Sequence, residues 1–153
     1  MHDDGRWDDA MGLALAEARL ALVTDDVPVG AVVVDRDGTV VGAGHNEREA
    51  SGDPTAHAEV LALRAAARAL GTWRLDGCTL VVTLEPCAMC AGAIVAARIP
   101  RLVLGAWDEK AGATGSQWDL VRDPRSIHTV EVLPGIRSAE CEHLLKAFFA
   151  ARR

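Results

Sequence analysis

Tyrosine is absent from this 153-residue sequence, and phenylalanine occurs only twice. Leucine, valine and alanine must therefore form most of the core. Half of the residues are hydrophobic and a quarter are charged, which is the balance of an ordinary globular domain. We expect one domain spanning residues 1–153, because a chain of this length buries enough surface to fold without disulfide bonds or structural metal ions.

Cysteine is also scarce, and four cysteines are too few for a disulfide framework. The acidic start, MHDDGRWDDA, lacks the basic region of a signal peptide, and Glu17 and Arg19 interrupt the apolar stretch after it. No apolar run approaches the roughly 20 residues that a membrane-spanning helix needs. These absences predict a cytoplasmic protein with free thiols and no membrane partner.

An excess of positive charge is missing too, since the net charge is −6. This argues against a nonspecific nucleic-acid binder. The charge is unevenly distributed: residues 1–30 hold seven acidic and two basic residues, a balance of −5, whereas residues 137–153 hold four basic and two acidic residues, a balance of +2. Any polyanion binding would therefore use a local basic surface that includes the C-terminal end.

Apolar patterns and turn residues predict strands that alternate with helices after an opening hairpin. The expected strands are residues 29–35, 39–44, 78–84, 101–106 and 128–133, and the expected helices are 7–23, 53–71, 87–97 and 138–151. Asp53 and Pro54 are suited to the start of the second helix. Residues 107–127 read as a loop with one helical turn near Trp118. These elements imply a three-layer α/β/α domain with a mixed five-stranded sheet.

The stretch TLEPCAMCAG places Cys87 and Cys90 at the start of a predicted helix. This spacing alone is compatible with a redox pair, a structural metal site or a catalytic metal site. The positive end of the helix dipole favours the thiolate form, which binds metals. With His57, about 30 residues earlier, the two thiols give three ligands of the kind that zinc prefers.

The number of ligands separates structural from catalytic zinc sites. A structural zinc normally has four protein ligands, whereas a catalytic zinc has three and an open position. Candidates for a fourth ligand, none with a paired spacing, are Cys78, Cys141, His45, His128 and His143. Glu59 follows His57 by two residues, so the two side chains converge only at a helix end. We predict one zinc ion on His57, Cys87 and Cys90, with Glu59 as the catalytic base.

The chemistry expected of such a site is hydrolytic deamination. Zinc lowers the pKa of bound water to about 7, and Glu59 accepts the water proton and returns it to a ring nitrogen and the leaving amine. The motifs H-x-E and P-C-x-x-C together are typical of zinc nucleobase deaminases. The predicted substrate is therefore an aromatic base that carries an amine.

The sequence resembles the bacterial tRNA-specific adenosine deaminases over most of residues 7–153. The matching segments are VPVGAVVV, DPTAHAEVLALR, TLEPCAMCAGAI, GAWDEKAGATGS and the FFAARR ending. The resemblance implies a cytidine-deaminase-like fold and a homodimer with one zinc per subunit. It also implies conversion of the wobble adenosine of an arginine tRNA anticodon to inosine, with zinc-bound hydroxide attacking C6.

The resemblance further implies a set of substrate contacts. Asn46 matches a residue that hydrogen-bonds the flipped purine, and the backbone at Pro28, Val29 and Gly30 matches the pocket lining. Asp108 and Lys110, in the loop at 107–127, match residues that face the RNA. Further matches, in or just after the helix at 138–151, are Phe149, Arg152 and Arg153. Because adjacent helix residues do not share a face, we assign Phe148 to packing and Phe149 to RNA.

Three positions depart from the family pattern, and two other functions stay open. His45, Trp107 and Ala111 stand where Trp, Arg and Thr are usual, and Trp107 could stack on a base but removes a cation. A deaminase of free bases or nucleosides, such as guanine, fits the acidic net charge better. A noncatalytic zinc-stabilised binding module is the other alternative, and it would need a fourth ligand.

Overall fold

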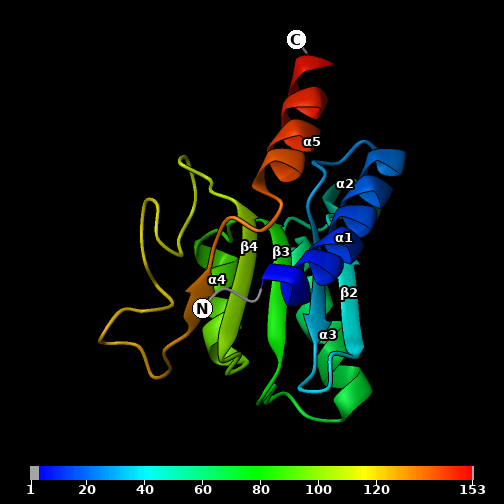
Figure 1. Cartoon of the computed structure of the whole chain (residues 1–153). Coiled ribbons are helices and arrows are strands. Elements are labelled where there is room, and N and C mark those ends of the chain that lie inside the picture. Colours follow the sequence, from blue (N-terminus) through cyan, green and yellow to red (C-terminus); the bar gives the residue numbers. More distant parts are fainter. Residues whose placement is uncertain (1–3, 153) are drawn as a thin grey trace.

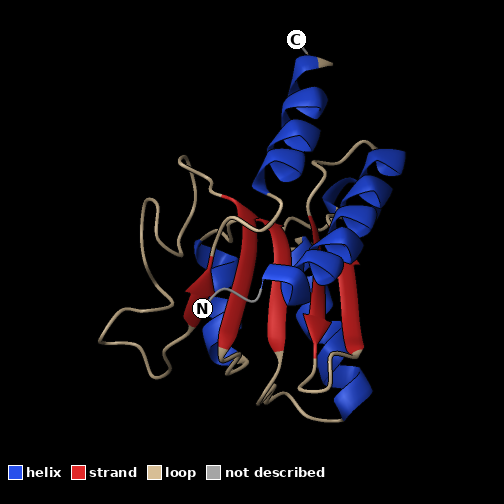
Figure 2. Cartoon of the chain, in the orientation of Figure 1, coloured by secondary structure: helices blue, strands red, loops and turns tan. Residues whose placement is uncertain are grey.

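The computed structural model describes residues 4–152 and shows one five-stranded sheet of order β2-β1-β3-β4-β5 (Figures 1 and 2). The strands are β1 (Gly30–Val34), β2 (Val40–His45), β3 (Thr79–Leu84), β4 (Arg101–Ala106) and β5 (Glu131–Leu133). β1 runs antiparallel to both β2 and β3, whereas β3, β4 and β5 are parallel. The sheet is therefore mixed, as the sequence predicts.

Helices cover both faces of this sheet. They are α1 (Asp4–Ala21), α2 (Arg48–Ser51), α3 (Ala58–Leu70), α4 (Ala88–Ala96) and α5 (Ser138–Ala150). Alternate residues of a strand point to opposite faces, and the core follows this rule: Val32, Val81 and Val103 pack with α1, while Leu80 and Leu104 pack with α3 and α4. The predicted three-layer α/β/α arrangement is confirmed.

Two local predictions are wrong, and one short helix was missed. The helix predicted from residue 53 begins at Ala58 instead, because the Asp53 carboxylate accepts hydrogen bonds from the backbone N–H and the hydroxyl of Thr55 and so forms a turn. The expected helical turn near Trp118 is replaced by an isolated bridge between Thr114 and Asp119. The short helix α2 was not predicted from the sequence.

Gly30 lets α1 lie directly on β1. A Cβ atom at this position would lie 2.0 Å from the carbonyl oxygen of Ala14 and 2.3 Å from the amide nitrogen of Ala18. We expect Gly30→Ala to lower the free energy of unfolding by about 1–3 kcal/mol, because the helix must move away from the sheet. Urea denaturation measures this, with Gly5→Ala as the control, since a Cβ at Gly5 meets no atom within 4 Å. Equal stability of Gly30→Ala and the parent protein would contradict the expectation.

None of the helices among residues 4–152 has both the length and the apolar character needed to cross a membrane.

Candidate active site

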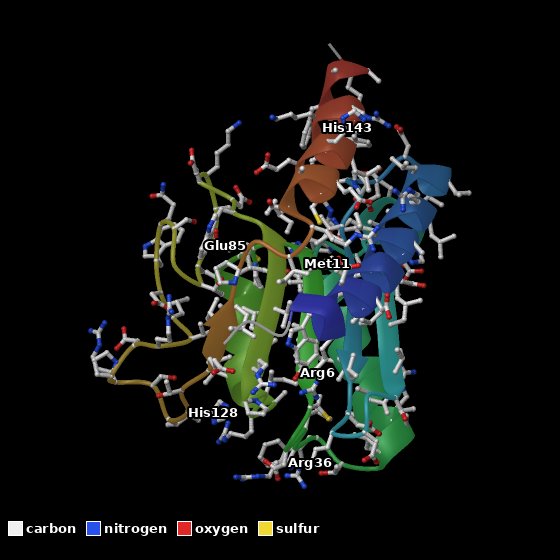
Figure 3. All side chains as sticks on the ribbon, viewed as in Figure 1. Arg6, Met11, Arg36, Glu85, His128 and His143 are labelled. Atoms are coloured by element: carbon white, nitrogen blue, oxygen red, sulfur yellow. The ribbon has the colours of Figure 1, made fainter. Side chains whose placement is uncertain are left out.

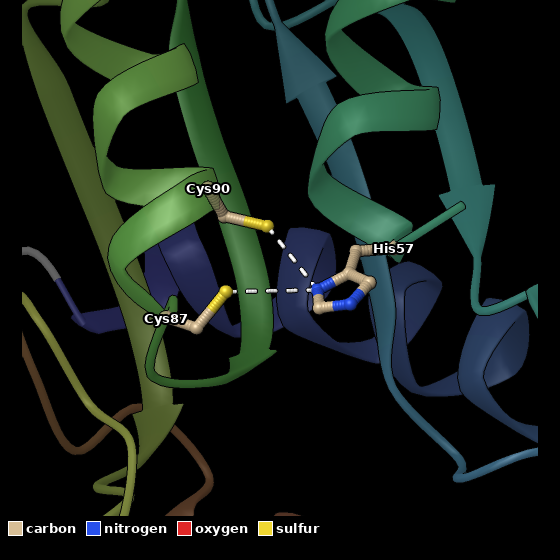
Figure 4. A group of neighbouring side chains, drawn as sticks. All are labelled: His57, Cys87 and Cys90. Carbon is tan, nitrogen blue, oxygen red and sulfur yellow. Dashed lines mark hydrogen bonds between the residues drawn. The ribbon is translucent and has the colours of Figure 1, made fainter. Parts of the chain in front are cut away.

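His57, Cys87 and Cys90 meet where two helices begin on the same face of the sheet (Figure 4). His57 precedes the first residue of α3 and Cys87 precedes the first residue of α4, both in extended conformation. The Nδ1 atom of His57 lies 3.5 Å from the Sγ atom of Cys90 and 3.7 Å from that of Cys87. One ligand atom from each of the three residues lies within 4.8 Å of the others. A single ion can therefore contact all three side chains.

The electrostatics of the two thiols differ, and those of Cys87 suit a metal ligand. The hydrogen bond from Cys90 lowers the pKa of Cys87 to about 5, with the backbone N–H groups of Cys90 and Met89 and the His57 ring acting in the same direction against burial. The pKa of Cys90 is raised, because its proton is held by Cys87 and the group is buried. Cys87 is thus a thiolate at neutral pH, and its sulfur is ready to bind a cation.

Glu59 lies in the first turn of α3, two residues after His57. Because His57 is extended and Glu59 is helical, the two side chains line one cavity despite their spacing. Glu59 is 4% exposed, and this burial raises the pKa of its carboxyl group to about 7. A carboxyl group with a pKa near neutrality both accepts and returns a proton.

The donor set fits zinc in a three-ligand site. Two sulfurs and one imidazole nitrogen are ligands that zinc prefers. Within residues 4–152, the group of side chains close enough to share an ion comprises these three. The five other candidates lie elsewhere. His45 contacts Glu17, His128 contacts the carbonyl oxygen of Ile99, and Cys78 precedes β3 at the opposite end of the sheet from Cys87. Cys141 and His143 lie on α5.

Two of the ligands, His57 and Cys87, line a cavity of about 190 Å³ together with Glu59, at the ends of β3 and β4. Val29, Asn46 and Asp108, predicted to contact substrate, line the same cavity. The carbonyl oxygen of the Asn46 side chain accepts a hydrogen bond of 2.9 Å from the backbone N–H of Ala58. This bond orients the side chain, so that its NH₂ group is the half left to donate to a ligand.

A larger groove of about 710 Å³ adjoins the cavity. Val27, Leu84 and Asp108 line both spaces, so the two lie side by side and share these walls. Lys110 and Phe149 lie in the groove, on the loop after β4 and on α5 respectively. Phe149 is 52% exposed, whereas its neighbour Phe148 is 7% exposed. The packing role expected of Phe148 agrees with this burial.

Other predicted contacts lie outside both spaces. Pro28 and Gly30 are buried beside the cavity without lining it. Arg152 donates a 2.8 Å hydrogen bond to the carbonyl oxygen of Phe148 and forms an ion pair with Asp25. Arg153 lies outside the described residues.

Sequence reasoning missed Arg48 and Glu85, which also line the cavity. Arg48 lies on α2 and pairs with the buried carboxylate of Asp26 at 3.0 Å. Burial opposes ionisation of Asp26, but the hydrogen bonds from the N–H groups of Glu49 and Val27 and from Arg48 outweigh it and lower the pKa. The sequence did contain a signal for Glu85: it is a charged residue between a buried strand and the metal ligand Cys87.

Comparison with known proteins shows which family has a site of this kind. The family described as "Cytidine and deoxycytidylate deaminase zinc-binding region" matches residues 6–106, a span that includes the three ligands and Glu59. The chain belongs to this zinc-binding deaminase family. The prediction of zinc is therefore confirmed, because a zinc-binding family and a suitable cluster of ligands coincide.

Individual members of the deaminase family are similar over nearly the whole chain. The tRNA-specific adenosine deaminase of Bacillus subtilis is 46% identical over 140 residues, which cover 92% of this chain and 86% of the relative. A solved structure from a study of A-to-I editing by tRNA:A34 deaminases at the wobble position is 46% identical, with a TM-score of 0.86 over 90% of this chain and 99% of its own. The resemblance inferred from the motifs is confirmed.

Other deaminases of this family share the fold at lower identity. The guanine deaminase from Nitrosomonas europaea is 28% identical, with a TM-score of 0.82 over 94% of this chain and 84% of its own. The fold is therefore common to this guanine deaminase and to the tRNA deaminases. Residues around the cavity must therefore determine which substrate each deaminase accepts.

Proposed function

We propose that this protein is a zinc-dependent hydrolase that converts the wobble adenosine of a tRNA anticodon to inosine. The observation that carries the proposal is that two spaces lie side by side: a small cavity lined by His57, Cys87 and Glu59, and a wide groove lined by Lys110 and Phe149. A flipped base fits the first, and the neighbouring nucleotides fit the second. The 46% identity to a tRNA-specific adenosine deaminase supports the same function.

In the proposed mechanism His57, Cys87 and Cys90 hold the zinc ion. Zinc held there supplies an activated water at near-neutral pH. Glu59 takes one proton from that water and passes it to the ring nitrogen, and it then takes the proton of the new C6 hydroxyl and passes it to the departing amine. A C–O bond forms at C6, the C–N bond breaks, and ammonia leaves. Burial of Glu59 keeps its proton from bulk solvent during the transfer.

Recognition of the base is assigned to Asn46 and the walls of the cavity. The NH₂ group of Asn46 donates to an acceptor on the purine, because its carbonyl oxygen is used by Ala58. Val29 supplies apolar contact from β1. RNA loops are usually bound by stacking on aromatic side chains and by cations near phosphates, and Phe149 and Lys110 provide these two groups in the groove.

We further propose that Pro28 and Gly30 shape the cavity wall through the backbone, and that Asp108 contacts the nucleotides beside the target. Arg152 and Arg153 follow α5 in the sequence and add positive charge there. The preferred substrate is an arginine tRNA. We also propose that residues 1–153 form one domain, which is supported by the two hydrophobic clusters that pack against one sheet.

A homodimer is the proposed assembly, and the cytoplasm is the proposed compartment. An apolar groove between α3 and α4 is lined by Val60, Leu63, Ala67 and Trp73, and Trp73 is 61% exposed. An exposed apolar surface of this kind is suited to a second subunit. The four free cysteines agree with a reducing compartment.

The decisive experiment uses the zinc-loaded protein and an arginine tRNA with an ACG anticodon. We expect inosine at the wobble position, read by sequencing, and no inosine at the other adenosines. A panel of other tRNAs that carry a wobble adenosine tests the arginine preference, and sedimentation of the same preparation gives the subunit stoichiometry. A folded, zinc-loaded protein that leaves the ACG anticodon unchanged would overturn the proposal.

The same protein preparation also tests the alternative function, deamination of free bases. The likeness to a guanine deaminase is the observation that favours it. Ammonia release from guanine or another small base, with the anticodon stem-loop untouched, would establish that function in place of tRNA editing.

A further inference from the structure

Glu85 is a buried carboxylate that the proposed chemistry does not use. It follows the last residue of β3 and is 2% exposed (Figure 3). Its Oε1 atom accepts hydrogen bonds from the backbone N–H of Asp108 at 2.9 Å and from the Ser116 hydroxyl at 2.6 Å. Its Oε2 atom accepts bonds of 3.0 Å from the backbone N–H groups of Thr114 and Ser116.

All four partners come from one stretch of loop, residues 108–116, which contains no regular helix or named strand. A carboxylate has about four acceptor positions, so those of Glu85 are filled by the loop. A general base needs a free lone pair for the proton that it takes. Glu85 is therefore placed to hold the loop and is not placed to carry a proton.

The loop is shaped to receive this carboxylate. A Cβ atom at Gly112 would lie 2.2 Å from both Cδ and Oε1 of Glu85 and 2.3 Å from the Ser116 hydroxyl oxygen. Only glycine leaves this space without displacing the buried side chain. Glu85 and Gly112 thus form one packed unit, although they come from separate segments of the chain.

The held loop forms walls of both the cavity and the groove. Asp108 and Ala111 line the cavity, and Trp107 and Lys110 line the groove. Glu85 itself lines the cavity next to Cys87, so it fixes the loop relative to the metal cluster. A shift of this loop would change the path between the two spaces while the ligands stay in place.

We propose that Glu85 is a positioning residue that fixes loop 108–116 and thereby aligns an RNA loop across the cavity and the groove. This inference rests on the proposed function, because the aligned substrate is the anticodon loop. The contribution is to substrate alignment, and zinc binding does not depend on it.

Two variants disturb the contact in different ways. Glu85→Gln replaces two acceptor oxygens by one and places an NH₂ group against backbone N–H donors. Gly112→Ala keeps the carboxylate and pushes it out of its position. Asp35→Asn is the matched control: its carboxylate also accepts two loop N–H bonds, from Asp37 and Thr39, but in the turn between β1 and β2 at the other end of the sheet.

Three measurements follow for each zinc-loaded variant: the zinc content, the rate of tryptic cleavage after Lys110 well below the melting temperature, and kcat and KM on the anticodon stem-loop. For both Glu85→Gln and Gly112→Ala we expect unchanged zinc, faster cleavage at Lys110 and a fall in kcat/KM of about 10- to 100-fold. Asp35→Asn should stay within about twofold of the parent protein.

Wild-type kcat and KM in either variant whose loop is cleaved faster would overturn the inference. Unchanged cleavage at Lys110 in both variants would overturn it as well. If Glu85→Gln fails to fold, Gly112→Ala provides the test, because it retains the carboxyl group of Glu85. A parent protein that does not edit RNA counts against the proposed function, and the cleavage rates then still show whether Glu85 holds the loop.

Discussion

Replacing Glu59 with glutamine should reduce the deamination rate by about 10²–10⁴-fold, the range typical of general acid–base catalysis. Glutamine has nearly the same shape as glutamate but accepts no proton, so the cavity keeps its form while the transfer stops. The three ligand side chains are unchanged, and zinc should remain bound at the parent level. Glu59→Ala should lose activity to a similar extent.

Single-turnover rates on the stem-loop and zinc analysis of the same samples test this expectation. The control is Glu131→Gln, since Glu131 is an exposed carboxylate that pairs with Arg101 at the opposite end of the sheet. Its rate should match that of the parent protein. Near-normal turnover by Glu59→Gln would remove Glu59 from the mechanism, whereas loss of zinc would point to a role in metal binding instead.

Removal of zinc should lower the activity at least about 10³-fold, because the pKa of the attacking water then rises far above neutrality. We expect the same from Cys87→Ala, which deletes the sulfur whose pKa is lowered to about 5. The chelated parent protein should recover its rate when zinc is added, and Cys87→Ala should not.

Cys78→Ala provides the matched control for that experiment. Cys78 is buried in the core before β3 and belongs to no metal-compatible group among residues 4–152. Its removal should lower stability slightly and leave the zinc content near one per chain. Full activity in the chelated parent protein, with zinc absent by metal analysis, would contradict a zinc-dependent reaction.

The parts of the fold that the sequence predicts are those with strong local patterns. The run RLVLGA corresponds to β4 residue for residue, and the apolar run before Glu85 corresponds to β3 within one residue. The start of α3 was misplaced because Asp53 and Pro54 satisfy the rules for a helix start, yet the Thr55 contacts form a turn there. The error did not affect the metal site, because the H-x-E spacing is independent of the first helical residue.

The candidate site was predictable where short motifs carry the chemistry, and less so where distant segments meet. His57, Cys87 and Cys90 were identifiable from ligand type and spacing. The contacts of Glu85 with loop 108–116 and of Arg152 with Asp25 join residues that are 23 or more positions apart. No periodicity in the sequence signals such contacts, because they depend on how the sheet and helices bring the segments together.

The separation between metal cluster and groove has a consequence for how this scaffold diversifies. The metal ligands lie at the starts of α3 and α4, which pack into the core. The walls that face the substrate lie on loop 108–116 and on α5. Loops tolerate substitutions and insertions far better than packed elements do. New substrates can therefore be acquired by exchanging loop 108–116 and the end of α5, with the deamination chemistry inherited unchanged.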